Sequence, residues 1–161
     1  MSKLLFSRVI VAITGSDASI LAAKYAIVMA KMYHCKVFAV YVVDTETLKQ
    51  LVSCRIFIDE ESLDYEHSLE ANGDRYLSFV EELASAKGVR IERSIRKGAV
   101  HTELLAAADE SNADLILLGG LEKDGNGRDI YWESHRKVFK NARCSVMLAK
   151  EPEIDQIYKQ A

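Results

Sequence analysis

Short apolar runs alternate along this chain with longer segments in which apolar residues recur every three or four positions. The runs are rich in β-branched residues and too short for helices, which is typical of strands buried on both faces. We therefore expect five strands. They are predicted at residues 9–13, 36–43, 89–95, 115–118 and 146–149.

Helices are expected between these strands, because the apolar residues there keep the spacing of one helix face. The first helix follows Ser16 and Asp17, either of which can cap it by accepting a hydrogen bond from a first-turn N–H. A long helix is expected over residues 61–87, and Gly73 on its apolar face marks either close packing or a kink. Two more helices are predicted, one carrying residues 104–108 and one over residues 131–142.

Two segments fall outside this alternation. Residues 45–60 fit either a helical turn near 48–52 or an extended, lid-like stretch at 56–58, and a packed connection is the expected interpretation. Residues 151–161 are mostly polar and predict a surface tail, so the folded domain is expected to cover residues 1–150.

The order of the predicted elements is strand, helix, strand, repeated along the chain. Such alternation implies parallel strands joined by right-handed crossovers. The sequence thus predicts a single doubly wound, Rossmann-like α/β domain, with a five-stranded parallel sheet and helices on both faces. The turn at Gly119 and Gly120 follows a strand at its carboxyl end, where open α/β sheets bind their ligands.

Composition and charge limit the kinds of partner that this protein is expected to bind. The 161 residues carry a net charge of −3, which gives no electrostatic footprint for nucleic acid. No apolar run reaches the roughly 18–20 residues of a membrane span, and the start lacks the long apolar region of a signal peptide. Three cysteines without CxxC spacing indicate reduced thiols. We expect a cytoplasmic protein that binds neither nucleic acid nor membrane.

Catalytic motifs are absent from the sequence. There is no Walker A motif, GxSxG elbow or HExxH pair, and Gly15-Ser16-Asp17 is interpreted as a turn and helix cap. The four histidines are scattered over the predicted helices, and the loop at 124–135 lacks the carboxylate that ends a calcium site. We therefore expect no catalytic residues and no metal.

Several segments of this chain resemble segments of the universal stress protein family, and they occur in the same order. The stretch Val9–Ser16 is similar to the family's opening strand and turn, and Val40–Asp44 to its second strand. Residues 98–119 resemble the third helix and fourth strand, and residues 140–148 the closing helix and strand. The resemblance covers residues 6–150 and implies a homodimer through the last strand, Ser145–Ala149, an apolar strand at the sheet edge.

ATP-binding members of the family carry a motif after the fourth strand: Gly, two residues, Gly, nine residues, Gly, and then Ser or Thr. Glycines there let backbone N–H groups approach phosphates. Counted from Gly119, the later positions are Glu122, Trp132 and Glu133 in this sequence. Thr14 stands where these members commonly have an Asp. The resemblance therefore implies a member with a degenerate ATP motif.

A second interpretation of the loop stays open. Gly125 and Gly127, with Arg128 beside them, form either a displaced anion-binding nest or a simple turn with positive φ. If nucleotide binds, the resemblance assigns it to the crevice at the strand ends. The candidate residues are Ala12, Thr14, Val42, Gly98, Leu118, Gly119, Gly120, Gly125 and Gly127.

The sequence thus predicts a non-enzymatic stress-response protein without a cofactor, acting through dimerisation and through protein partners of unknown identity. The alternative is an ATP- or AMP-binding member that acts as a nucleotide-dependent switch through a rearranged glycine loop. A third hypothesis is a small α/β enzyme or electron-transfer flavoprotein-like fragment that uses the same crevice. It requires either a bound cofactor or a catalytic group, and the sequence shows no such group.

Overall fold

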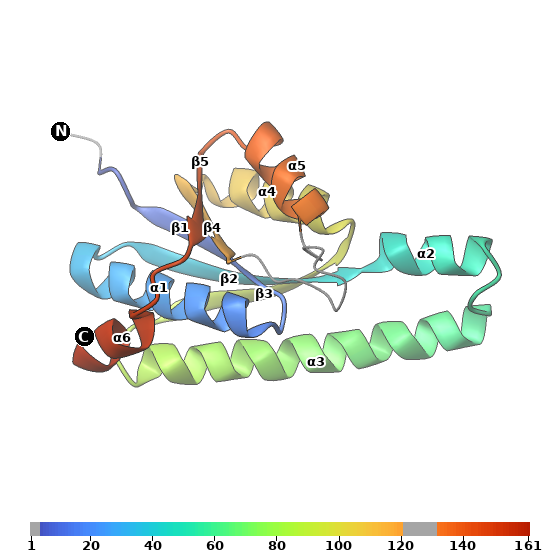
Figure 1. Ribbon diagram of the computed structural model, residues 1–161, viewed down its shortest axis with the longest axis horizontal. Coiled ribbons are helices and arrows are strands. Elements are labelled where there is room, and N and C mark those ends of the chain that lie inside the picture. The colour runs from blue at the N-terminus through green and yellow to red at the C-terminus, as the bar shows by residue number, and fades with distance from the viewer. Residues whose placement is uncertain (1–3, 121–131) are drawn as a thin grey trace.

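The computed structural model describes residues 4–120 and 132–161, which form a twisted sheet with helices on both faces (Figure 1). The strands are β1 Arg8–Ile13, β2 Lys36–Asp44, β3 Ile91–Gly98, β4 Leu115–Gly119 and β5 Ser145–Ala149. The helices are α1 Asp17–Tyr33, α2 Thr45–Ser53, α3 Asp59–Ser85, α4 Val100–Ser111, α5 Trp132–Asn141 and α6 Ile154–Gln160. No helix in the described ranges is long and apolar enough to cross a membrane.

The sheet has the spatial order β3-β2-β1-β4-β5, and its described strand pairs are all parallel. Strand order reverses between β1 and β4, which defines the switch point of a doubly wound fold. Helices α1 and α3 cover one face of the sheet, and α4 and α5 cover the other. The predicted fold class is therefore confirmed, because β1 and β4, buried on both sides, carry the continuous apolar runs that such a position requires.

Strand β3 has a weaker apolar pattern than the other strands because it lies at the sheet edge and carries charged side chains. Arg93 reaches Glu81 on α3 at 2.7 Å, and Arg96 reaches Glu110 on α4 at 2.7 Å. These ion pairs join the strand to the helices above and below it. The strand begins at Ile91 and continues to Gly98, two residues later at its start and three residues further at its end than the apolar pattern predicts.

Residues 45–60 contain a helix rather than a simple connection. Asp44 caps α2, because its carboxylate accepts hydrogen bonds from the backbone N–H and the hydroxyl of Thr47, at 3.0 and 2.7 Å. Helix α3 begins at Asp59 and runs for 27 residues. Together, α2 and the first part of α3 project beyond the end of the sheet (Figure 1).

Residues 151–161 do not form the predicted surface tail. Ile154–Gln160 is helix α6, which packs on α1, and the Ile154 side chain is only 4% exposed. The Tyr158 hydroxyl donates to the carbonyl oxygen of Leu83 at 2.6 Å, and Lys24 forms an ion pair with Asp155 at 2.5 Å. The few apolar residues of this segment therefore extend the core that α1 and α3 share.

Candidate ligand-binding crevice

A cavity of about 300 Å³ opens at the carboxyl ends of β1 and β2, beside the switch point. Ala12 and Thr14 of the first strand and its turn form one wall, and Val42 of β2 forms another. The ladder between β1 and β2 ends at the pair Ile13–Tyr41, whereas β2 continues to Asp44 beside β3. The crevice therefore lies where β2 extends past β1.

The Thr14 hydroxyl is held within the turn that leads into α1. It lies 2.8 Å from the Ser16 hydroxyl, and the Thr14 backbone N–H donates to Ser19 Oγ at 3.1 Å. Ser16 is the N-cap of α1, since its hydroxyl accepts from the Ser19 N–H at 3.1 Å. The sequence predicted Ser16 or Asp17 as the cap, and the structure assigns this role to Ser16.

The remaining candidate residues that the structure describes do not line this cavity. Leu118 and Gly119 lie at the end of β4, where Leu118 is buried and Gly119 packs against α1. Gly120 lines a separate hollow, of about 330 Å³, between α1 and the segment that leads into α6. Gly98 ends β3 opposite Asp44, with a φ of 148° that favours glycine. Gly125 and Gly127 lie outside the described residues.

Sequence reasoning missed several lining residues. Leu69 comes from α3, Val100 and Leu104 from α4, and Ser134 from α5. The fold places these helices over the strand ends, and nothing in the local sequence marks Leu69, Val100 and Leu104 as lining residues. Ser134 had a signal, however: counted from Gly120 instead of Gly119, the hydroxyl position of the family motif falls on Ser134 rather than Glu133.

The electrostatics of the described lining are anionic. Among the described residues, 4–120 and 132–161, Asp44 is the one charged side chain that lines the cavity. Close by, burial lowers the pKa of His101, the charge of Lys137 lowers it further, and Asp44 opposes both. His101 is therefore neutral at pH 7 and supplies no positive charge to the crevice. A phosphate group gains no cationic partner from this lining.

The described residues also bear on metal binding and on thiol chemistry. No group of three or more His, Cys, Asp or Glu side chains is arranged to hold a metal ion among the described residues. Cys54 is exposed, whereas burial raises the pKa of the Cys35 and Cys144 thiols. Raised pKa values leave these two thiols protonated and unreactive near neutral pH.

These features define a class: a doubly wound α/β protein with a small, mostly apolar crevice at its switch point. Comparison with known proteins leads to the same class of protein. Residues 5–150 match the family model described as the universal stress protein family, and the chain belongs to that family. Universal stress protein MJ0531 of Methanocaldococcus jannaschii is 32% identical over 149 residues, which cover 92% of this chain and 84% of the relative.

Solved structures share the fold. A universal stress family protein from Burkholderia pseudomallei aligns with a TM-score of 0.72 at 21% identity, covering 93% of this chain and 100% of that one. The universal stress protein of Archaeoglobus fulgidus in complex with dAMP aligns with a TM-score of 0.63 at 17% identity, and the alignment covers 91% of this chain and 100% of that one. At these identities the likeness concerns the fold alone.

Proposed function

We propose that this protein is a non-enzymatic, cytoplasmic member of its family that acts as a homodimer through protein partners, without binding ATP. The observation that carries the proposal is the charge of the crevice, whose described lining offers Asp44 and no cation. A triphosphate there would meet an anion at short range and would leave its own hydration uncompensated.

The turn at Thr14 supports the same conclusion. ATP-binding relatives commonly have an Asp at this position, and here the side chain is a hydroxyl that is engaged with Ser16 at 2.8 Å. The glycine motif is also degenerate, since Trp132 and Glu133 replace its last two positions and both side chains are exposed at the start of α5. A tryptophan there would prevent the close approach of backbone and phosphate that glycine permits.

Homodimerisation is proposed through β5, Ser145–Ala149. This strand lies at the edge of the sheet, with its apolar residues Val146, Met147 and Leu148 only partly buried. An uncovered apolar edge strand favours pairing with another strand, and two copies of β5 would satisfy each other's backbone groups around a two-fold axis. A particle of twice the 18.0 kDa chain mass is expected in sedimentation, and a monomer would contradict this part of the proposal.

Nucleotide binding is the second candidate function, and the apolar cavity favours it. Walls formed by Ala12, Val40 and Val42 suit a planar base, and a relative with the same fold is in complex with dAMP. In this alternative the phosphates are held by residues 119–129, with Gly125 and Gly127 as the anion nest. The protein would then be a switch controlled by ATP or AMP.

One experiment separates the two. The purified protein is denatured and tested for released nucleotide and for absorbing cofactors, and fresh protein is titrated with ATP, AMP and adenosine by calorimetry. We expect no nucleotide and no heat of binding. Micromolar ATP or AMP binding that disappears in Val42→Phe, a substitution that fills the cavity, would establish the switch instead, and a bound flavin would favour the enzyme hypothesis.

A complementary test restores the motif. The triple variant Glu122→Gly, Trp132→Gly, Glu133→Ser is expected to gain ATP affinity if the lost glycines and hydroxyl are what prevents binding. Unchanged affinity would instead assign the loss to the crevice itself, at Thr14 and Asp44.

A further inference from the structure

The projecting α2–α3 hairpin, residues 45–66, contains an open groove. A hollow of about 470 Å³ lies between the two helices. Val52 and Leu63 are its apolar lining, and its charged lining residues are Asp59, Glu66 and Lys49, a net charge of −1. The hairpin projects beyond the end of the sheet (Figure 1), and Glu66 at the inner end of the groove lies 3.8 Å from Lys97 of β3. The volume of the groove is sufficient for a large side chain of another molecule.

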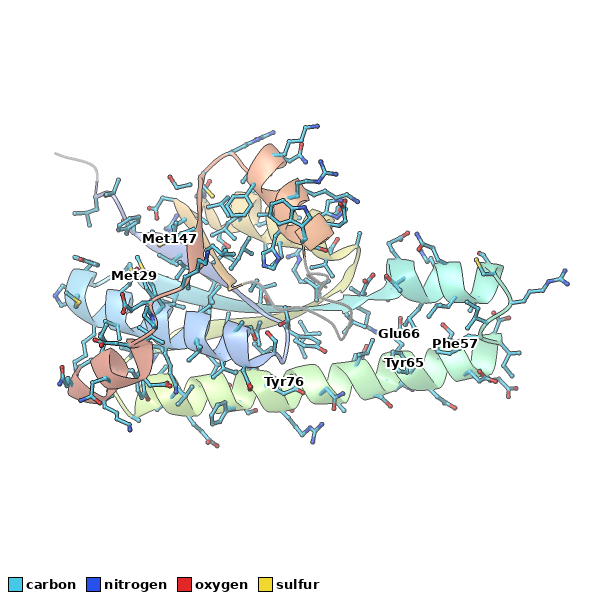
Figure 2. All side chains as sticks on the ribbon, in the orientation of Figure 1. Met29, Phe57, Tyr65, Glu66, Tyr76 and Met147 are labelled. Carbon is cyan, nitrogen blue, oxygen red and sulfur yellow. The ribbon has the colours of Figure 1, made fainter. Side chains whose placement is uncertain are left out.

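The hairpin is braced, although much of its apolar surface is uncovered. Phe57, in the connection, and Tyr65, on α3, contact each other in a tilted arrangement with ring centroids 5.8 Å apart, and Figure 2 labels both in this hairpin. Ile58 and Leu63 nevertheless remain 59% and 53% exposed. Aliphatic side chains gathered at the end of a projecting element are typical of an interaction surface rather than of a folding core.

The hairpin is strongly acidic. Residues 45–66 contain six carboxylates and two cations, a charge of −4, although the whole chain carries only −3. Three of the carboxylates, at residues 59–61, lie in the first turn of α3, where the helix dipole stabilises them. A surface of this kind fits an apolar side chain surrounded by positive charge.

The outer side of α5 has that chemistry. Val138 and His135 are buried on its inner side, next to α4, and Phe139 is 43% exposed on the outer side. Arg136, Lys140 and Arg143 are exposed around Phe139. Residues 132–143 hold four cations and one carboxylate, a charge of +3. Arg136, Phe139, Lys140 and Arg143 are called the α5 face below.

We propose that the α5 face of one copy docks in the α2–α3 groove of a second copy. Phe139 enters the groove against Val52 and Leu63, and the surrounding cations lie opposite Asp59 and Glu66. The occupant is a second copy because the chain itself carries both complementary surfaces, of opposite charge and each with exposed apolar groups. Neither surface includes β5, so this contact is separate from the proposed strand-pairing dimer.

Salt distinguishes the two contacts. Strand pairing through β5 rests on backbone hydrogen bonds and apolar contacts, and added salt weakens these interactions little. Docking of the α5 face rests partly on exposed charges, whose attraction falls as the Debye length shortens. Sedimentation velocity is therefore run at about 50 mM and about 500 mM NaCl, and we expect a larger assembly at low salt whose dissociation constant rises roughly tenfold at high salt.

Charge reversal tests which surfaces meet. Asp59→Lys with Ser62→Lys reverses the charge of the groove lining from −1 to +2, and Arg136→Glu with Lys140→Glu reverses the charge of the α5 face. Each variant alone should lose the salt-sensitive assembly, because its two surfaces then carry the same sign. An equal mixture should regain it, since the reversed groove meets the reversed face and the native pair meets as well. Lys31→Glu with Arg90→Glu, a reversal at exposed positions elsewhere, should assemble as the unmodified protein does.

Phe139→Ser is expected to remove the assembly without reversing any charge. Circular dichroism and thermal unfolding of each variant establish that the fold is kept. The proposal is overturned if the unmodified protein shows no salt-sensitive assembly, if the mixture of reversed variants does not regain it, or if Phe139→Ser leaves it intact. A loss of nucleotide binding or of the β5 dimer would leave these outcomes unaffected.

Discussion

Gly119 at the end of β4 lies directly against the backbone of Ala18 at the start of α1. A Cβ atom at position 119 would come within 2.8 Å of the Ala18 carbonyl carbon and within 2.9 Å of the Ser19 nitrogen. This close approach requires glycine whether or not a phosphate is nearby. Retention of the first glycine of the family motif is therefore explained by helix–strand packing and is not evidence for nucleotide binding.

Gly119→Ala is accordingly expected to lower the free energy of unfolding by about 1–3 kcal/mol, because backbone atoms of α1 must move to admit the methyl group. Urea denaturation measures the change. Gly120→Ala is the matched control: the nearest atom, the Ala149 carbonyl oxygen, would lie at 3.4 Å, an ordinary contact. Equal effects of the two substitutions would refute the packing explanation.

Helix α6 is expected to contribute to stability through Ile154. This side chain is 4% exposed, and Ile154→Ala should cost about 2–4 kcal/mol by leaving a cavity between α6 and α1. Ile157, on the same helix, is 37% exposed, so Ile157→Ala should cost about 1 kcal/mol or less. Thermal unfolding of both variants makes the comparison, and similar small losses would mean that residues 151–161 behave as the tail predicted from composition.

The sheet was predictable because each buried strand needs apolar residues on both faces, and few other structures use such short runs. Helix α6 was missed although Ile154, Ile157 and Tyr158 have helical spacing, because the segment is short and mostly polar. Strand β3 was placed inaccurately because its charged residues weaken the apolar pattern and pair with the helices before and after it, as Arg96 does with Glu110 at 2.7 Å.

The site was less predictable than the fold. Thr14 and Val42 could be named as candidates because the family resemblance implies a ligand at the strand ends, and parallel strands bring their carboxyl ends together. Leu69 and Ser134 line the same cavity from helices whose position over the strand ends depends on tertiary packing. Periodicity reveals which side of a helix is apolar but not how far along the sheet that helix lies.

Gly73 marks close packing rather than a kink, because α3 runs without interruption through it and presses on Tyr41 of β2. A Cβ at position 73 would clash with the Tyr41 ring, and the ring's own Cγ would lie at 3.0 Å. Gly73→Ala should therefore destabilise the protein by about 1–3 kcal/mol despite the better helix propensity of alanine.

The sign of that effect is expected to reverse when the ring is removed. In a Tyr41→Val background, Gly73→Ala meets no ring, and the gain in helix propensity should stabilise the protein by up to about 1 kcal/mol. Chemical denaturation of the four proteins in this cycle gives both values. If Gly73→Ala destabilises equally in both backgrounds, contact with Tyr41 is not the reason for the glycine.

His101 is expected to make stability depend on pH. Burial lowers its pKa below the ordinary value of 6.5, so as pH falls the unfolded chain binds a proton before the folded one does. Its contribution to stability is full above pH 6.5 and is lost as pH falls through that value toward the lower folded pKa. Unfolding is compared at about pH 7.5 and about pH 5.5, where His101→Gln should show a smaller loss than the unmodified protein.

Asp44 provides the converse test. Its negative charge raises the pKa of His101, against the effects of burial and Lys137, so Asp44→Asn should lower that pKa further. The same variant loses the cap of α2 at both pH values, and only the difference between the two pH values reports on His101. That difference should be larger in Asp44→Asn than in the unmodified protein and should shrink again in the double variant with His101→Gln. A pH dependence that is identical in all four proteins would show that His101 titrates alike in the folded and unfolded chains.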